Sequence, residues 1–420
     1  MTMPRTARRA LGAFAALALT ATAAACSTSS SSSGSSGSSA SSGSFTVWDP
    51  YPQFDNSSAW VQLLDKCGSQ AGVTIKRTAY DTTSLTSKAL LAAQQGVSPD
   101  VLIVDNPVVS TLASAGILTD TSANHIDTSS VEANLLGAGE YQGKTYGVPI
   151  GANTLALYYN KNILKSAGVD PTTITNWASL TAALAKVKAV GKTGITFSAI
   201  GTEEGSFQFE PWFWGSGAQL TDLGSAQAVS ALSLWTNWLK DGYAPNSVIN
   251  DTQTTSWAEF AAGNTAFSEN GTWQLANAEK ASFAYGVMPI PAENGGAAPV
   301  PTGGEFVTVP QQSDTGRYAT SEKIVSCLTN AENAYTTDTT LSYIAATSAV
   351  QAKQAATTPA LGVWVTAVHA GKARTGDDLG TKYPKISQQL WTAVQSALSG
   401  SASPQSALTS AQSAAQSAIG

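Results

Sequence analysis

The 420-residue chain has few of the side chains that carry metal and redox chemistry. It contains two histidines, His125 and His369, and three cysteines, so a histidine-rich metal site is excluded. We interpret both histidines as surface or capping residues. No CxxC, HExxH, phosphate-loop or GxSxG pattern occurs after residue 44, and such patterns mark metal, nucleotide and serine-hydrolase sites. The sequence therefore predicts a protein without a metal, a cofactor or enzymatic activity.

Carboxylates are the remaining candidates for acid–base chemistry. A glycosidase works with two carboxyl groups flanking the scissile bond, and Glu203-Glu204 or Glu210 with Glu269 offer such pairs. Any chain of this length offers pairs of this kind. A surface carbohydrate-active enzyme therefore stays as the contrasting alternative to a binding protein.

Charge is also scarce. Only 12% of the residues are charged and the formal net charge is −6, which argues against nucleic acid as a partner because that needs a basic surface. After the first 26 residues no segment approaches 18 consecutive apolar residues, so no membrane span is expected there. Hydrophobic residues make up 43% of the chain, enough to fill the cores of two or three domains.

The start of the chain predicts export and attachment to a membrane. Arginines precede an apolar run over residues 10–25, which is shorter than the roughly 20 residues of a membrane span and ends in small residues. This order is typical of a secretory signal. Cys26 follows directly, as in a bacterial lipobox, so we predict that residues 1–26 are a lipoprotein signal and that Cys26 is lipidated. Ordinary secretion with an incidental cysteine is the alternative.

A flexible tether is predicted after the signal. Residues 27–44 are mostly serine and glycine, a composition that has no core of its own. A chain of this length and composition has a root-mean-square span of roughly 25 Å. That length would hold a globular body just off the membrane and let it rotate.

The other two cysteines, Cys67 and Cys327, form an even pair outside the predicted signal. Outside the cytoplasm such a pair can be oxidised to a disulfide. Two buried free thiols are the alternative.

Strands and helices are predicted to alternate in the first part of the folded body. The apolar run 101–104 is typical of a parallel strand buried on both faces, and its predecessors follow the same alternation. The predicted strands are 45–51, 73–77 and 101–104, and the predicted helices are 58–70 and 85–95. This order indicates βαβ units in a doubly wound sheet.

Polar and aromatic residues follow two of these strands at their carboxyl ends. Trp48 and Asp49 end the first strand, and Asp105 with Asn106 follows the third. Ligands of such sheets bind outside the carboxyl ends of the strands, so we expect these side chains to meet at one edge. Capping of loops by Asp and Asn is the alternative.

The densest aromatic cluster is FQFEPWFWGSG, in which Glu210 stands two residues before Trp212. A sugar has apolar ring faces and a polar rim, so its receptor needs flat aromatic surfaces beside carboxylates or amides. Because Pro211 interrupts the segment and Gly215 ends it, we expect neither a regular helix nor a strand here. A buried core cluster is the alternative to a binding role.

Several segments occur in a fixed order: PDVLIVD, YQGKTYGVPI, ALYYNKNILKSAGVDP, TNWASL, ENGTWQLAN and YGVMPIPAENGG. In order and spacing this set resembles the extracellular solute-binding proteins of carbohydrate ABC importers, and among them the maltose-binding type. The resemblance covers essentially all of residues 45–420. It implies an α/β, two-lobed periplasmic-binding-protein-like fold of type II, with each lobe a sheet flanked by helices. Hinge strands near 148–153 and 303–308 would join the lobes and let them close on a ligand.

The resemblance also implies ligand contacts. FEPWF looks like the family's glutamate-proline-tyrosine segment that touches sugar, with Trp212 in place of tyrosine, and GTW looks like the segment that brings a tryptophan over the sugar. Asp105 matches a hydroxyl-binding aspartate, and residues 303–305 match the segment that recrosses the hinge. The predicted ligand-binding residues are Trp48, Asp49, Asp105, Asn153, Glu210, Trp212, Trp273, Gly303, Gly304 and Glu305.

We expect the following domain boundaries for a two-lobed protein of this kind. Residues 45–150 and 303–350 are assigned to an N-terminal lobe, and residues 151–302 and 351–420 to a C-terminal lobe. The predicted function follows: a monomeric, lipid-anchored receptor on the extracytoplasmic face of the bacterial membrane, which captures a sugar and delivers it to an ABC permease. A quaternary ammonium compound held by tryptophans, or a polyamine held by carboxylates, is the alternative solute.

Overall fold

The computed structural model describes residues 44–376 and 379–420. The predicted signal, the lipidation site at Cys26 and residues 27–43 of the linker lie outside the described residues. Within the described part, none of the helices combines the length and the apolar character needed to cross a bilayer.

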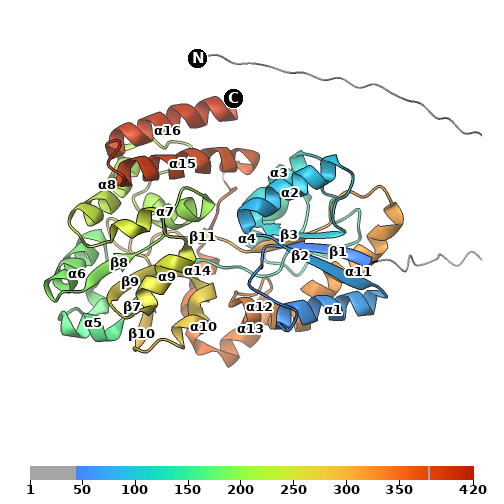
Figure 1. Ribbon diagram of the computed structural model, residues 1–420, viewed down its shortest axis with the longest axis horizontal. Helices are drawn as coiled ribbons and strands as arrows, with labels where there is room; N and C mark the ends of the chain where they lie inside the picture. Colours follow the sequence, from blue (N-terminus) through green and yellow to red (C-terminus); the bar gives the residue numbers. More distant parts are fainter. Residues whose placement is uncertain (1–43, 377–378) are drawn as a thin grey trace, which may run out of the picture. The chain divides into compact units, whose positions relative to one another are not determined.

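The first sheet has five strands in the order β2-β1-β3-β12-β6. β1 pairs in parallel with β2 and β3, whereas β12 is antiparallel to both β3 and β6. Figure 1 shows these strands gathered from distant parts of the chain. Their bounds are Ser44–Asp49 (β1), Thr74–Ala79 (β2), Val101–Asp105 (β3), Val148–Pro149 (β6) and Glu305–Thr308 (β12).

Helices cover both faces of this sheet. On one face, α1 (Ala59–Ala71) and α11 (Tyr318–Thr329) pack over Phe45 and Val47 of β1. On the other, α2 (Thr82–Gln94) and α3 (Val109–Ser114) share a smaller core with Trp48. Strand side chains alternate between faces, so the residues of β1 divide between the two cores. The predicted βαβ order of this region is confirmed within two or three residues at each boundary.

The second sheet has four strands in the order β10-β7-β9-β8. β7 is antiparallel to β9 and β10, and β8 is parallel to β9. The bounds are Leu155–Asn160 (β7), Thr193–Thr196 (β8), Thr265–Gly271 (β9) and Tyr285–Met288 (β10). The helices around it are α5 (Lys161–Ser166), α6 (Trp177–Ala189), α7 (Glu203–Gly215), α8 (Ala226–Lys240), α9 (Gln253–Ala261), α10 (Leu275–Ala278), α15 (Tyr383–Leu398) and α16 (Pro404–Ile419).

The aromatic segment FQFEPWFWG is helical, which corrects the expectation of irregular structure. It lies in α7, and every residue from 205 to 214 is buried. Pro211 stands inside the helix, where it removes a backbone donor and would usually break the helix. Tertiary packing outweighs this cost, because α7 is enclosed by α8 and α15.

Two segments connect the sheets at a point of close backbone approach. Residues 150–154 lead from β6 to β7, and β11 (Pro301–Thr302) with Gly303 and Gly304 leads back into β12. Asn153 and Gly303 form an isolated antiparallel bridge. Gly304 has a φ of 114°, and a Cβ there would collide with the Gly151 carbonyl oxygen, so only glycine fits. These segments lie where hinge strands were predicted.

After α11 the chain forms α12 (Ala331–Leu341), α13 (Ser348–Thr357), α14 (Gly362–His369) and β13 (Lys372–Ala373). Earlier in the chain, between β3 and β6, lie α4 (Ala133–Leu136) and the short hairpin of β4 (Glu140–Tyr141) and β5 (Lys144–Thr145). β13 pairs in parallel with β11 beside the returning segment. The residue that follows β13 reaches the site described below.

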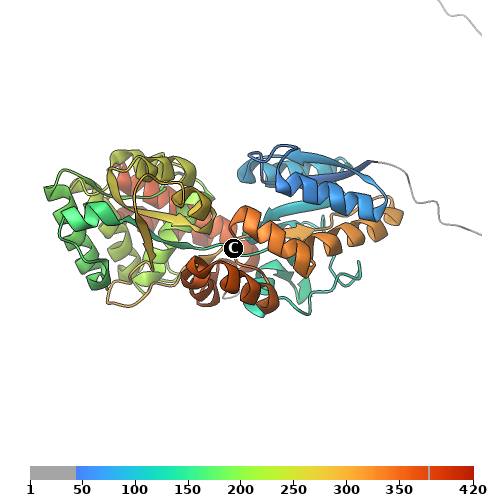
Figure 2. The same ribbon diagram turned by 90° about the horizontal axis from the view of Figure 1, so that it is seen from below.

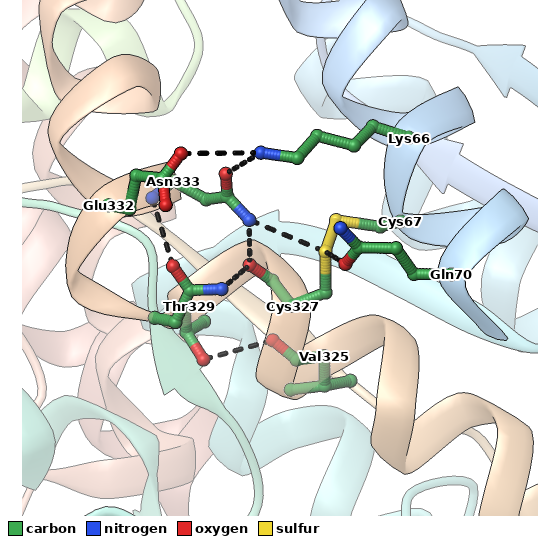
Figure 3. Close-up of a disulfide and its surroundings, with 9 residues drawn as sticks. Lys66, Cys67, Gln70, Val325, Cys327, Thr329, Glu332 and Asn333 are labelled. Carbon is green, nitrogen blue, oxygen red and sulfur yellow. Dashed lines mark hydrogen bonds and ion pairs between the residues drawn. A yellow bond between two sulfur atoms is a disulfide. The ribbon is translucent and has the colours of Figure 1, made fainter.

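Cys67 of α1 and Cys327 of α11 are joined by a disulfide with an S–S distance of 2.05 Å. Figure 3 shows the bond beside a polar group in which Lys66 Nζ donates to Asn333 Oδ1 at 2.9 Å and lies 3.6 Å from a Glu332 carboxylate oxygen. In Figure 2, α1 (blue) runs alongside the orange helices of the 318–341 region. The bond ties the first helix of the fold to a segment 260 residues later.

Removing this cross-link should destabilise the protein substantially. A bond that closes so long a loop restricts the unfolded chain, and losing a native disulfide typically costs about 2–5 kcal/mol. We expect the Cys67→Ser/Cys327→Ser double variant to lose about that much in a guanidinium titration. Reducing agent should shift the wild-type midpoint in the same direction and leave the double variant unchanged. An identical wild-type midpoint with and without reductant would contradict this expectation.

Candidate functional site

A cavity of about 310 Å³ lies where the first sheet meets α7 and the end of β9. Its walls come from the chain after β1, from the ends of β3 and β12, and from the segment after β13. Glu305 at the start of β12 stands beside Asp105 at the end of β3, because the two strands are antiparallel. The lining residues are Pro50, Tyr51, Gln53, Thr82, Asp105, Asn153, Glu203, Glu204, Phe207, Gln253, Thr254, Trp273, Gly303, Glu305, Tyr343 and Arg374.

Arg374 is the centre of the polar wall and is 2% exposed. Its Nη2 donates to Asp105 Oδ1 at 2.8 Å and to Asn106 Oδ1 at 2.9 Å, and its Nη1 donates to Glu203 Oε1 at 2.8 Å. The guanidinium also lies 4.8 Å from the centroid of the Phe207 ring. Burial opposes its charge, but the neighbouring Asp105, Tyr383 and Glu203 outweigh burial and raise the pKa of Arg374 well above its usual value. One cation therefore links the first sheet to α7.

Behind Glu203 a second carboxyl group continues the network. The Tyr383 hydroxyl lies 2.5 Å from Glu203 Oε1 and 2.8 Å from Glu210 Oε1, but it carries a single proton. Burial, reinforced by the charge of Glu203, raises the pKa of Glu210 well above its usual value. Glu210 can therefore keep its proton and donate to Tyr383, while Tyr383 donates to Glu203.

Two of the predicted contacts on α7 do not line this cavity. Trp212 is fully buried among Trp177 and Trp238, and its indole N–H donates to Glu269 Oε2 at 2.7 Å. Glu210 is likewise fully buried against Tyr383. On a helix, residues three and four apart share a face, so Glu203 and Phe207 reach the cavity and Trp212 points elsewhere.

The predicted contacts on β1 do not line the cavity either. Asp49 is fully buried, with its carboxylate bound by Arg77 at 2.5 Å and by the Trp60 indole N–H at 3.1 Å. Trp48 lies on the opposite face of the strand, where its ring packs edge-on against Tyr80 at 5.2 Å. Pro50 and Tyr51, which directly follow the strand, line the cavity instead.

Five of the predicted residues line the cavity. They are Asp105, Asn153, Trp273, Gly303 and Glu305. Gly304 is the neighbour of two of them, and its carbonyl oxygen accepts the Asn106 N–H at 3.1 Å, which fixes the turn after β3. Ligand contact by any of these residues stays a prediction.

Several lining residues were not foreseen as ligand contacts. Tyr51 follows the WDP segment directly, and Glu203-Glu204 stood out only as a carboxylate pair. Tyr343 and Arg374 lie in the C-terminal region, where the resemblance assigns no contact. Because the chain carries little charge, the presence of an arginine at this position was the one sequence feature that could have pointed to a role for Arg374.

Glu305 sits between two tyrosines at the cavity wall. Its Oε2 accepts the Tyr51 hydroxyl at 2.7 Å and the Tyr343 hydroxyl at 2.8 Å, and the residue is 8% exposed. Burial, together with the charge of Asp105, raises the pKa of Glu305 to about 7. The group therefore changes charge near neutral pH.

This pKa predicts how stability depends on pH. Between the ordinary glutamate value of 4.5 and about 7, folded Glu305 keeps a proton that the unfolded chain has released. The free energy of unfolding therefore falls as pH rises through this window, and Glu305 contributes up to roughly 3 kcal/mol of that fall. Chemical denaturation of wild type and Glu305→Gln at several pH values should show a shallower decline in the variant. Parallel curves for the two proteins would contradict the assignment.

Removing the central cation should be costly. Arg374→Met leaves the half-buried Asp105 and Glu203 without their partner, and because breaking a fully buried ion pair typically costs about 3–5 kcal/mol, we expect a loss at or below the lower end of that range. As a control, Lys144→Met removes an ion pair with Asp120 whose lysine side chain is 60% exposed, which should cost less than about 1 kcal/mol. Guanidinium unfolding compares the two, and equal losses would be inconsistent with the role given to Arg374.

Comparisons with known proteins agree with this architecture. The family profile described as bacterial extracellular solute-binding protein matches residues 62–363. A maltooligosaccharide ABC transporter solute-binding lipoprotein of Streptococcus pneumoniae is 28% identical over 258 residues, which is 58% of this chain and 59% of that protein. The curated relatives at 30% identity are matched over only 40% of their length.

Solved structures show the same fold. The GacH receptor of Streptomyces glaucescens, solved unliganded and with acarbose, aligns with a TM-score of 0.75 at 24% identity, over 89% of this chain and 97% of its own. UgpB of Mycobacterium tuberculosis in complex with glycerophosphocholine aligns with a TM-score of 0.79 at 23% identity, over 90% and 98%. Two lobes of the type II periplasmic-binding-protein kind are therefore the fold of this chain.

Proposed function

Because the chain belongs to the bacterial extracellular solute-binding proteins, we propose that it captures a sugar in the cavity described above and delivers it to an ABC permease. The observation that carries this proposal is the composition of the wall. Aromatic rings of Tyr51, Phe207, Trp273 and Tyr343 stand among carboxylates and amides. Flat rings suit the apolar faces of a pyranose, and acidic and amide oxygens suit its hydroxyls.

The location of the cavity supports capture by closure. Asp105, Glu305 and Tyr51 come from the first sheet and its loops, whereas Glu203, Phe207 and Trp273 come from α7 and the end of β9. A ligand drives closure only if it binds the closed state more tightly than the open one. A ligand held by both groups meets this condition, and the closed form would then be the one offered to the permease.

We further infer that the protein works while tethered to the outer face of the membrane. The predicted lipobox at Cys26 and the serine- and glycine-rich segment after it support this inference. The streptococcal relative is itself named a lipoprotein. We also propose that the receptor works as a monomer.

A thermal-shift screen tests the sugar proposal. A ligand that binds only the native state raises the melting temperature, so at least one mono- or oligosaccharide should do so. If none raised it at millimolar concentration, while a non-sugar solute did, the sugar proposal would be wrong.

Trp273 lines the cavity whereas Trp212 is buried in the core, so substitutions at the two residues should have different effects. Trp273→Ala removes a ring from the cavity wall, so the affinity for the best sugar of the screen should fall by about tenfold or more, at a loss of about 1.4 kcal/mol, with little change in melting temperature. Trp212→Phe deprives buried Glu269 of its donor and should cost about 1–3 kcal/mol of stability with little change in affinity. Calorimetric titration and thermal unfolding of both variants measure this. Unchanged affinity in Trp273→Ala would refute the site assignment.

A further inference from the structure

Glu305 uses its two carboxyl oxygens differently. The hydroxyls of Tyr51 and Tyr343 both donate to the same oxygen, Oε2. The second oxygen, Oε1, accepts no hydrogen bond among the described residues, and it is not one of the fully buried side-chain atoms that lack a partner. Because Glu305 lines the cavity, Oε1 is the oxygen that a ligand there can reach.

The two tyrosines keep their protons while Glu305 titrates. Burial, and after it the charge of Glu305, raises the pKa of Tyr51 and of Tyr343 well above the ordinary value of 10.0. Both hydroxyls therefore remain donors to Oε2 whether Glu305 is charged or neutral. Because Oε2 already accepts two hydrogen bonds, the proton of the neutral acid sits on Oε1.

Two charged groups also face Glu305. Asp105 lies opposite on β3 and disfavours ionisation, whereas Arg374 after β13 favours it with a smaller effect. None of the ion pairs recorded in the described part of the chain includes Glu305. Burial is the largest influence, and it raises the pKa of Glu305 from 4.5 to about 7. Near neutral pH, Oε1 therefore carries a proton in about half of the molecules.

A bound sugar changes the surroundings of Glu305 in two opposing ways. Closure removes water, which favours the neutral acid, whereas a hydroxyl that donates to Oε1 favours the carboxylate. The first effect is small, because Glu305 is already only 8% exposed. The second is larger, because hydrogen bonds to an ionised acceptor are roughly twice as strong as those between neutral groups. A sugar hydroxyl therefore prefers the ionised form.

Building on the proposed capture of a sugar, we propose that a ligand hydroxyl donates to Oε1 of Glu305 and displaces the proton from that oxygen, so that the receptor binds sugar more tightly as pH rises. The O–H bond of the acid breaks and its proton goes to the solvent. The resulting carboxylate accepts a hydrogen bond from the intact sugar hydroxyl. Proton and sugar compete for one oxygen atom, and acidification weakens capture.

Affinity and stability should then respond to pH in opposite directions. The pKa of Glu305 is lower in the complex than the value of about 7 in the free protein. The gain in affinity is therefore fully present above that value and is lost as pH falls through the lower value of the complex. If binding lowers the pKa by one unit or more, affinity rises about fivefold to tenfold between about pH 6 and about pH 8. The free energy of unfolding falls over the same range, so a variant that only loosens the fold cannot imitate this pattern.

Titration calorimetry measures both the affinity and the proton. The thermal-shift screen begins with glucose, maltose and cellobiose, and the sugar with the largest shift becomes the probe. Its affinity is compared at about pH 6 and about pH 8. Titrations at neutral pH in phosphate and in imidazole, buffers with different heats of ionisation, count the protons exchanged. We expect release of roughly half a proton per sugar bound, because about half of the Glu305 groups are protonated there.

A variant assigns the proton to its residue. Burial also raises the pKa values of Glu203, Glu204 and Glu210, so the wild type alone does not identify the group that titrates. Glu305→Gln keeps an oxygen for the two tyrosines but has no carboxyl proton to release. Its affinity for the probe should be nearly equal at both pH values, and the two buffers should report no proton release.

Glu269→Gln is the matched control. Glu269 is a fully buried carboxyl group outside the cavity, where it accepts the Trp212 indole N–H. Its pKa is raised well above the usual value by burial, so glutamine resembles the protonated acid that it replaces. This variant should keep the pH dependence and the proton release of the wild type. Melting temperatures of both variants verify folding.

The outcomes separate this proposal from sugar capture itself. Sugar binding that is independent of pH, or that weakens as pH rises, would overturn the proton linkage and leave the sugar proposal standing. Wild-type pH dependence in a folded Glu305→Gln protein would overturn the role of Glu305. If no sugar binds at any pH, the sugar proposal is wrong and the proton linkage fails with it.

Discussion

The ion group formed by the buried Arg374 with the half-buried Asp105 and Glu203 is the interaction on which the site depends. One guanidinium, 2% exposed, holds a carboxylate at the end of β3 and another at the start of α7. Without the cation these two acids would repel each other in a poorly solvated place. Their pairing with Arg374 therefore connects the first sheet to α7, and the cavity forms beside it.

The carboxylates near this ion group have two different roles. Acids that touch Arg374 or a tyrosine pair build the wall, while Glu210 and Glu269 are buried behind it against Tyr383 and Trp212. Burial raises the pKa of both buried groups well above the usual value, so they work as hydrogen-bonding acids.

Much of the fold could be predicted because its signals are local. Ser58 and Asp81 cap α1 and α2, and the apolar run of β3 is buried throughout its first four residues. The place of Asp105 after a buried strand and the family segment around Trp273 pointed to two residues that line the cavity. Trp48 and Asp49 were assigned to the ligand because the sequence shows that a strand ends there, but not which neighbour satisfies each side chain.

The sequence by itself determined the order of strands and helices, the caps and turns that bound them, and the supply of aromatic and acidic side chains. These depend on residues within a few positions of one another. Only the tertiary structure decided which face of α7 meets the cavity and which acids are neutralised. The physical reason is that helix orientation and ion pairing depend on distant partners: Arg374 lies 269 residues from Asp105, and no local pattern encodes that contact.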